Sequence, residues 1–210
     1  MAYKFNAGKT IEVLDRTEEE YKEWKKKDLT NAQFAMIQRL TSLEGKKVLD
    51  FGCFHGMLTE MINKKTQAKC TGVDINFLGE IPENCMLYDG KNLPFKDQSF
   101  DIALMIEVVE HLEDINGILN EVCRILKPGG EVILTTANKY SVSLWKKDHR
   151  HWKNQIKQIL KLQTRECIKL YSFSELKKLG EKHGFSCESY GRLKRFPFLR
   201  RGFILKLTKR

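Results

Sequence analysis

Residues 47–56 read Lys47-Val48-Leu49-Asp50-Phe51-Gly52-Cys53-Phe54-His55-Gly56. The first five residues form a short, mostly apolar run, which is typical of a strand buried on both faces of a parallel sheet. Gly52 and Gly56 follow this run, and a helical pattern then continues to about Lys64. A strand, a glycine turn and a helix in this order predict the first unit of an α/β domain.

The rest of the chain continues this alternation. Further strands are expected at 68–74, 86–88, 100–106 and 131–136, with a helix near 115–126 and a turn at 128–130. After a helix at 174–183, two closing strands at 185–190 and 203–207 have a short connection, which favours antiparallel pairing. We therefore expect a single α/β domain of the Rossmann-like, doubly wound kind, with a mostly parallel seven-stranded sheet and an antiparallel last strand.

Length and composition are those of one ordinary globular unit. The 210 residues are 41% hydrophobic and 30% charged, which fits one domain with a substantial core. We expect an N-terminal helical segment at 1–44 and the main domain at 45–210, with a basic insertion or lid at about 139–170. No signal peptide or membrane-spanning run is recognisable, so we expect a cytoplasmic protein. The six cysteines have no zinc-ligand spacing, which favours reduced structural thiols.

The net charge of +10 is distributed unevenly along the chain. Residues 139–210 hold 20 Lys and Arg against 5 Asp and Glu, whereas residues 1–138 hold 17 against 22. The basic last third is expected to face an anionic partner: a phosphorylated or lipid-linked small molecule, RNA, or the surface of an anionic membrane. A solvated basic face without a partner is the alternative.

Two features indicate a nucleotide-type cofactor. The glycine turn at 50–56 allows the backbone to approach a ligand closely at the carboxyl edge of the sheet. Asp74 ends the second strand, where a carboxylate can accept both hydroxyls of an adenosine ribose. The glycine turn alone is equally compatible with a purely structural role.

Several ordered motifs resemble those of the class I S-adenosylmethionine-dependent methyltransferases, in particular their small-molecule, type 11-like branch. The matching stretches are Val48–Cys53, Gly72–Asp74, Asp89–Phe95 with Ser99–Asp101, Glu107–Leu112 and Arg124–Gly130. The resemblance covers about residues 45–138. A dehydrogenase also uses a glycine turn and a strand-two carboxylate, but the later motifs and the closing antiparallel strands argue against that class.

The resemblance implies S-adenosylmethionine as cofactor and S-adenosylhomocysteine as product. The cofactor-binding residues that it implies are Asp50, Gly52, Cys53, Phe54, Gly56, Asp74, Ile75, Asp89, Gly90 and Glu107. Two departures bear on the affinity for the cofactor. Phe54 stands where the family usually has glycine, and the connection after Asp74 is so short that the usual second helix is expected to be reduced to a turn.

The residues of the methyl-transfer step are harder to predict, because the sulfonium is already an excellent leaving group and the protein mainly has to align the acceptor. A general base is needed where the acceptor is a hydroxyl. His111, directly after the fourth strand, is a candidate base, and His149 in the basic insertion is a candidate substrate contact. Packing of the loop is the alternative role for His111.

Two other functions remain open at this point. Glu107, Glu110 and His111 resemble part of the metal site of small-RNA 2′-O-methyltransferases, with His149 or His151 as a further ligand. The chain would then be a metal-dependent RNA methyltransferase. Phe54 in the glycine turn motivates the second alternative, a non-catalytic protein that binds the cofactor.

Overall fold

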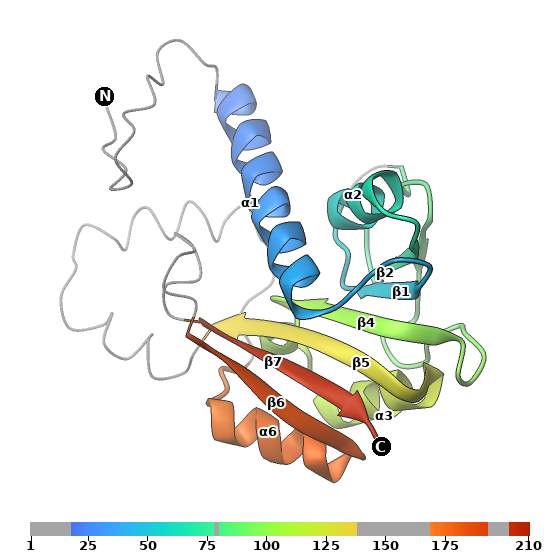
Figure 1. Ribbon diagram of the computed structural model, residues 1–210. Helices are drawn as coiled ribbons and strands as arrows, with labels where there is room; N and C mark the ends of the chain where they lie inside the picture. The colour runs from blue at the N-terminus through green and yellow to red at the C-terminus, as the bar shows by residue number, and fades with distance from the viewer. Residues whose placement is uncertain (1–17, 78–79, 138–168, 193–201) are drawn as a thin grey trace, which may run out of the picture.

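A computed structural model describes residues 18–77, 80–137, 169–192 and 202–210, and Figure 1 shows one continuous twisted sheet with helices on both of its faces. The seven strands lie in the order β3-β2-β1-β4-β5-β7-β6. All pairs from β3 to β5 are parallel, whereas β7 is antiparallel to both β5 and β6. The predicted seven-stranded, mostly parallel α/β fold with an antiparallel last strand is confirmed.

The chain builds this sheet in the alternating order expected from its sequence. The strands are β1 (Lys47–Phe51), β2 (Lys69–Asp74), β3 (Cys85–Leu87), β4 (Phe100–Ile106), β5 (Leu126–Ala137), β6 (Phe185–Arg192) and β7 (Gly202–Lys209). The helices are α1 (Glu18–Leu40), α2 (Met57–Lys65), the short 3₁₀ turn η1 (Val109–His111), α3 (Ile115–Ile125) and α6 (Phe173–Lys182).

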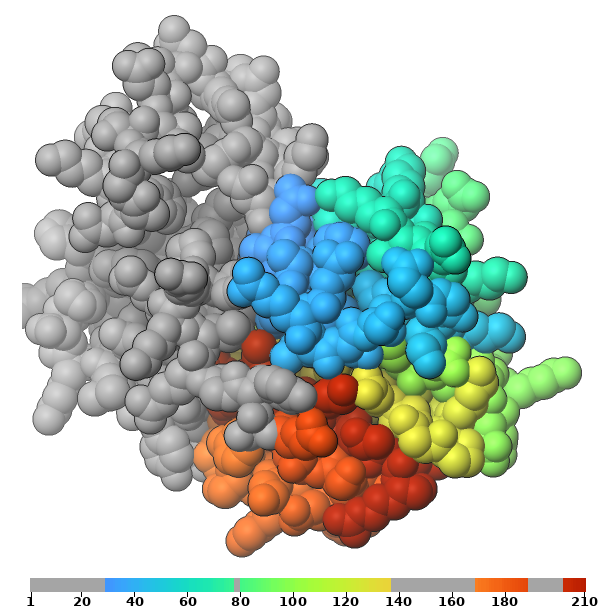
Figure 2. Space-filling model, viewed as in Figure 1, coloured from blue at the N-terminus to red at the C-terminus, as the bar shows by residue number. Residues whose placement is uncertain are grey.

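Two hydrophobic cores cover the two faces of the sheet. Successive strand residues point to opposite faces, so Val48 joins the core under α1 and α2, while Leu49 joins the core under α3 and α6. Ile37 of α1 and Ile62 of α2 are both fully buried in the first core. In Figure 2 the surface of α1 from residue 29 onward directly adjoins that of α2, and Figure 1 shows α3 and α6 on the other side of the sheet.

The N-terminal turns of two helices have side-chain caps that the sequence encodes. Asp114 accepts a hydrogen bond from the backbone N–H of Gly117 at 2.9 Å, and so caps α3. Ser172 and Glu175 form a reciprocal capping box at the start of α6, with each side chain bonded to the other residue's backbone N–H. These caps fix where the two helices begin, whereas the apolar positions along each helix decide which face packs on the sheet.

One sequence prediction needs a correction at β5. Residues 128–130, expected as a turn before the strand, lie within β5, which already begins at Leu126. The register with β4 shifts between Phe100 and Ile102, and Gly129 has a positive φ of 73°. A β-bulge therefore takes up the glycine-rich stretch without ending the strand.

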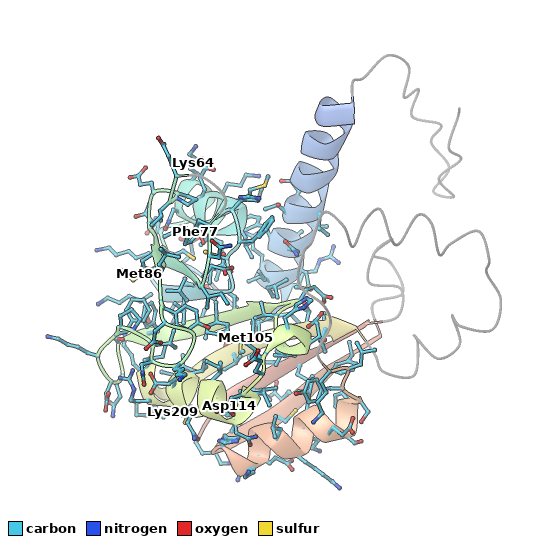
Figure 3. All side chains as sticks on the ribbon, turned by 180° about the vertical axis from the view of Figure 1, so that it is seen from behind. Lys64, Phe77, Met86, Met105, Asp114 and Lys209 are labelled. Atoms are coloured by element: carbon cyan, nitrogen blue, oxygen red, sulfur yellow. The ribbon has the colours of Figure 1, made fainter. Side chains whose placement is uncertain are left out.

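The connection between β2 and β3 is short, as predicted. Its described residues, 75–77 and 80–84, contain no helix. The Cys85 backbone N–H donates to the Pro82 carbonyl at 3.0 Å, which closes a single turn before β3. β3 is a three-residue edge strand, and Met86 lies at the outer margin of the sheet in Figure 3. No helix in the described part of the chain is long and apolar enough to cross a membrane.

Candidate active site at the carboxyl edge of the sheet

The glycine turn after β1 has a left-handed backbone at three positions. The φ angles of Gly52, Phe54 and Gly56 are 73°, 51° and 69°. Glycine adopts such angles freely, whereas a residue with a side chain does so at a cost of about 1–2 kcal/mol. The geometry therefore explains both glycines. It also identifies Phe54 as a strained residue, whose ring is 45% exposed and packs edge-on against His55.

Close packing beneath the turn also requires a glycine at position 72 of β2. A Cβ on Gly72 of β2 would lie 2.7 Å from Cys53 Sγ and 2.8 Å from Cys85 Sγ. The Cys53 thiol thus points into the core, and burial raises its pKa far above the ordinary thiol value. The Cys53 backbone N–H donates to the Val73 carbonyl at 3.1 Å and its carbonyl accepts the Gly56 N–H at 2.9 Å, so Cys53 shapes the turn from within.

Asp50 stabilises the turn from the inside of the protein. It is 3% exposed, and the Thr59 hydroxyl of α2 donates to its Oδ2 at 2.7 Å. Burial raises the pKa of Asp50 to about 6, although the Thr59 hydrogen bond opposes this shift. Asp50 therefore positions the turn against α2. The sequence analysis missed Thr59, because a threonine inside a helical pattern gives no signal of its own.

Asp74 joins the ends of β1 and β2. Its Oδ2 accepts the Phe54 backbone N–H at 2.9 Å, and its Oδ1 accepts the Ile75 backbone N–H at 2.7 Å. The Asn76 backbone N–H also donates to Oδ1, at 3.3 Å, so three backbone donors hold this carboxylate. The carboxylate thus fixes the glycine turn against the end of β2.

The segment after β3 forms a neighbouring wall. Asp89 is exposed and accepts the backbone N–H groups of Lys91 and Asn92 at 2.8 and 2.6 Å, which lowers the pKa of its carboxyl. A Cβ on Gly90 would lie 3.6 Å from Ile75, whose side chain is 47% exposed. Ile75 and Gly90 therefore line one apolar wall, with the Asp89 carboxylate beside it.

Glu107 is an unusual residue at the end of β4. Its φ of 56° is left-handed, and its Oε1 is buried and has no hydrogen-bond partner in the part of the chain that the structure describes. Burial raises the pKa of Glu107 to about 8, and the adjacent Glu110 carboxylate adds to the shift, while the Thr135 hydroxyl opposes it. An uncharged carboxyl with one unpartnered oxygen, Oε1, is thus held at this edge of the sheet, where a cationic ligand would ionise it.

Glu110 and His111 belong to η1, directly after Glu107. Glu110 is 3% exposed and accepts the Thr136 hydroxyl of β5 at 2.9 Å, so it joins η1 to the sheet. His111 is half-buried at the end of the same turn. Within the described ranges, no group of three or more His, Cys, Asp and Glu side chains has an arrangement that could hold a metal ion. His149 and His151, the further candidates, lie outside those ranges.

The carboxyl ends of β2, β1 and β4 are neighbours in the sheet, so these segments form one continuous edge. The family model described as "Methyltransferase domain" matches residues 21–190. The chain belongs to this family. The resemblance to class I S-adenosylmethionine-dependent methyltransferases of the type 11-like branch is thereby confirmed, and with it the S-adenosylmethionine cofactor.

Two bacterial relatives resemble part of this methyltransferase domain. The ubiquinone biosynthesis O-methyltransferase of Pseudomonas fluorescens strain Pf0-1 is 30% identical over 127 residues, which cover 53% of each chain. The protein of the same name from Methylococcus capsulatus is 33% identical over 116 residues, or 49% of this chain and 48% of its own. The chain thus spans about half the length of the curated relatives it matches.

Solved structures show the same fold at low sequence identity. A putative methyltransferase solved in complex with the Haloferax volcanii Trm112 methyltransferase activator has a TM-score of 0.65 at 18% identity, covering 91% of this chain and 94% of its own. A possible histamine N-methyltransferase from Thermotoga maritima has a TM-score of 0.61 at 19% identity, covering 90% and 96%.

The residues at the edge fit S-adenosylmethionine. The glycine turn gives close backbone access, the Asp74 carboxylate lies beside it at the end of β2, and Ile75 and Gly90 form an apolar wall. The buried Oε1 of Glu107 is an acceptor without a donor, and the cofactor carries cationic groups that would complement it. This edge of the sheet is therefore the candidate site for the cofactor.

Gly52→Ala is expected to destabilise the methyltransferase domain by about 2–4 kcal/mol. The new Cβ would lie 2.6 Å from Val108 Cγ2, and overpacking of this kind typically costs 1–3 kcal/mol beyond the backbone strain of about 1 kcal/mol. Gly129→Ala is the matched control, since Gly129 has the same φ of 73° but open space around it. Urea unfolding of both variants should show a loss of only about 1 kcal/mol in Gly129→Ala. Equal losses in the two variants would rule out a clash with Val108.

Proposed function

We propose that this protein transfers a methyl group from S-adenosylmethionine to a hydroxyl oxygen of a small or lipid-linked aromatic acceptor. The observation that carries the methyl transfer is the joined edge of Asp74, the glycine turn and Glu107. The choice of an oxygen acceptor rests on the relatives, which are named O-methyltransferases of ubiquinone biosynthesis. A hydroxyl acceptor also gives His111 a chemical role.

In this proposal the edge residues hold and orient the cofactor. Asp74 accepts the ribose hydroxyls, Ile75 and Gly90 contact the adenine ring, Asp89 receives its amino group, and Glu107 faces the cationic end. When bound, the cofactor supplies an electrophilic methyl group on a sulfonium and leaves as neutral S-adenosylhomocysteine. The remaining task of the protein is to align the acceptor oxygen and to remove its proton.

His111 is the proposed general base. It directly follows Glu110, whose carboxylate is fixed to the Thr136 hydroxyl of β5, so the turn that carries the imidazole cannot move independently of the sheet. The imidazole would take the hydroxyl proton while the new oxygen–carbon bond forms and the carbon–sulfur bond breaks. A positioned base of this kind typically contributes a factor of about 100 or more to the rate.

Methyl transfer from radiolabelled S-adenosylmethionine tests the proposal. Three acceptors would be tested: a catechol with a short isoprenoid chain, the same catechol without the chain, and a short RNA oligonucleotide with a free 3′ end. We expect label in the ether product of a catechol, and His111→Gln should lower kcat about 100-fold. The same variant should bind S-adenosylhomocysteine with an unchanged Kd, because its cofactor residues are intact.

The two alternative functions predict different results in this assay. A metal-dependent RNA methyltransferase, with Glu107, Glu110 and His111 as ligands, would label the oligonucleotide and would lose activity with a chelator. A non-catalytic cofactor-binding protein would bind S-adenosylhomocysteine but would label none of the acceptors. Label in a catechol that persists in the presence of a chelator excludes both alternatives.

A further inference from the structure

A basic groove lies at the amino edge of the sheet, opposite the cofactor edge. It has a volume of about 420 Å³, and its lining includes Lys47, Lys69, Lys96, Thr71 and Phe95. Lys47 and Lys69 open β1 and β2, whereas the cofactor contacts lie at the carboxyl ends of these strands. The groove is therefore separate from the methyl-transfer site.

The two strand lysines stand side by side on one face of the sheet. Lys47 is the register partner of Lys69, and Leu49 is the register partner of Thr71, so all four side chains point to the face that carries Leu49 and α3. Like charges placed directly opposite each other in a sheet are destabilising. Both side chains are exposed, and an anion bound between them would neutralise the two like charges.

No carboxylate lines this groove. In the described part of the chain, the ammonium groups of Lys47, Lys69 and Lys96 and the Thr71 hydroxyl have no hydrogen bond or ion pair. The larger cavity on the other face of the same edge, about 510 Å³, differs in this respect. There Lys127 pairs with Asp101 at 2.7 Å and Lys206 with Glu131 at 2.6 Å.

An aromatic wall completes the groove. Phe95 is half-buried and packs edge-on against the buried Phe100, with ring centroids 4.8 Å apart. Arg124 donates to the Phe95 carbonyl at 2.8 Å, which holds this loop in place. An aromatic ring beside unpaired ammonium groups is the combination that binds the planar base and the phosphate of a nucleotide.

We propose that this groove is a second binding site, for a small phosphorylated ligand with a planar ring, of the nucleoside phosphate class. The phosphate binds between Lys47, Lys69 and Lys96, and the ring packs on Phe95. The proposal is independent of the proposed methyl-transfer reaction, because it uses none of the cofactor residues.

The test is a calorimetric titration with uridine 5′-monophosphate at low salt, on the full chain saturated with S-adenosylhomocysteine so that the cofactor site is closed to the probe. Uridine and inorganic phosphate are titrated separately as control ligands. We expect uridine monophosphate to bind more tightly than either control ligand, and Lys69→Gln to weaken its binding about tenfold. Lys64→Gln is the matched control, since Lys64 lies on α2 on the other face of the sheet (Figure 3) and pairs with Glu60. The Lys64→Gln variant should bind uridine monophosphate with an unchanged affinity.

Thermal unfolding without ligand provides a second readout. Because Lys69→Gln removes one of two adjacent like charges and no hydrogen bond or ion pair, its Tm should not fall while its affinity for the probe falls. Three results would overturn the proposal: no binding of uridine monophosphate at low salt, equal weakening by Lys64→Gln, or a Tm that falls in Lys69→Gln. Affinity that rises steeply with the length of a single-stranded oligonucleotide would also overturn it, in favour of a nucleic-acid surface.

Discussion

Asp74→Ala should weaken the binding of S-adenosylhomocysteine about 1,000-fold. Hydrogen bonds to a charged acceptor contribute about 1.5–3 kcal/mol each, and two ribose hydroxyls would lose theirs together. The substitution also removes the acceptor of the Phe54 and Ile75 backbone N–H groups, so the glycine turn would lose its attachment to β2. Calorimetric titration of the variant measures the loss directly.

The matched control is Asp114→Ala, which also removes a carboxylate that accepts a backbone N–H. Asp114 caps α3, and the loss of such a cap costs about 1 kcal/mol of stability. The control should therefore unfold at lower urea but bind S-adenosylhomocysteine with an unchanged Kd. If Asp74→Ala kept its affinity to within tenfold, the ribose site would have to lie elsewhere on the edge.

The fold could be predicted from sequence because its signals are local and repeated. Strands such as β1 and β4 contain short apolar runs, and Val48 and Leu49 fill opposite cores without any need to know the strand order. The bulge in β5 was missed for a physical reason. Pro128-Gly129-Gly130 has the composition of a turn, and only the pairing of Ile102 with Glu131 shows that the strand continues through it.

The candidate site could be predicted only in part. Asp74 and the glycines were recognisable because their positions in the motif are fixed by the backbone. The support of Asp50 by Thr59, and of Glu110 by Thr136, depends on contacts between residues 9 and 26 positions apart, which no single-sequence pattern encodes. The position of Phe54, where the family usually has glycine, was visible in the sequence, but its left-handed φ of 51° became evident only in the structure.

Glu107→Gln should make the cofactor-free protein more stable at pH 8 than the wild type. The folded protein holds the Glu107 proton up to a pKa of about 8, whereas the unfolded chain releases it at the ordinary value of 4.5. Unfolding therefore releases a proton between these two values, and stability falls as pH rises through this window. The slope is about 1.4 kcal/mol per pH unit for a full proton, so the wild type should lose about 2–3 kcal/mol between pH 6 and pH 8.

Urea unfolding at pH 6 and pH 8 measures this difference. The pKa of Asp50 is raised to about 6, so its effect on the pH dependence of stability falls mainly below pH 6. Because Asp50 is present in both proteins, that effect cancels in the comparison. Glu121→Gln is the control, because Arg124 lowers the pKa of Glu121 and places its window at acid pH. Its stability should differ from that of the wild type by the same amount at both pH values. Parallel curves for Glu107→Gln and the wild type would mean that Glu107 is ionised in the folded protein.

The same carboxyl links cofactor binding to pH. If the cationic end of S-adenosylmethionine lies against Glu107, binding lowers the Glu107 pKa and releases up to one proton per site between pH 6 and pH 8. Calorimetric titrations in two buffers with different ionisation enthalpies count that proton, and Glu107→Gln should release none. Binding that releases no proton in the wild type, with the stability difference still present, would place the cofactor's charge away from Glu107. The buried Oε1 would then belong to the acceptor side of the site, because the same edge must hold both reactants.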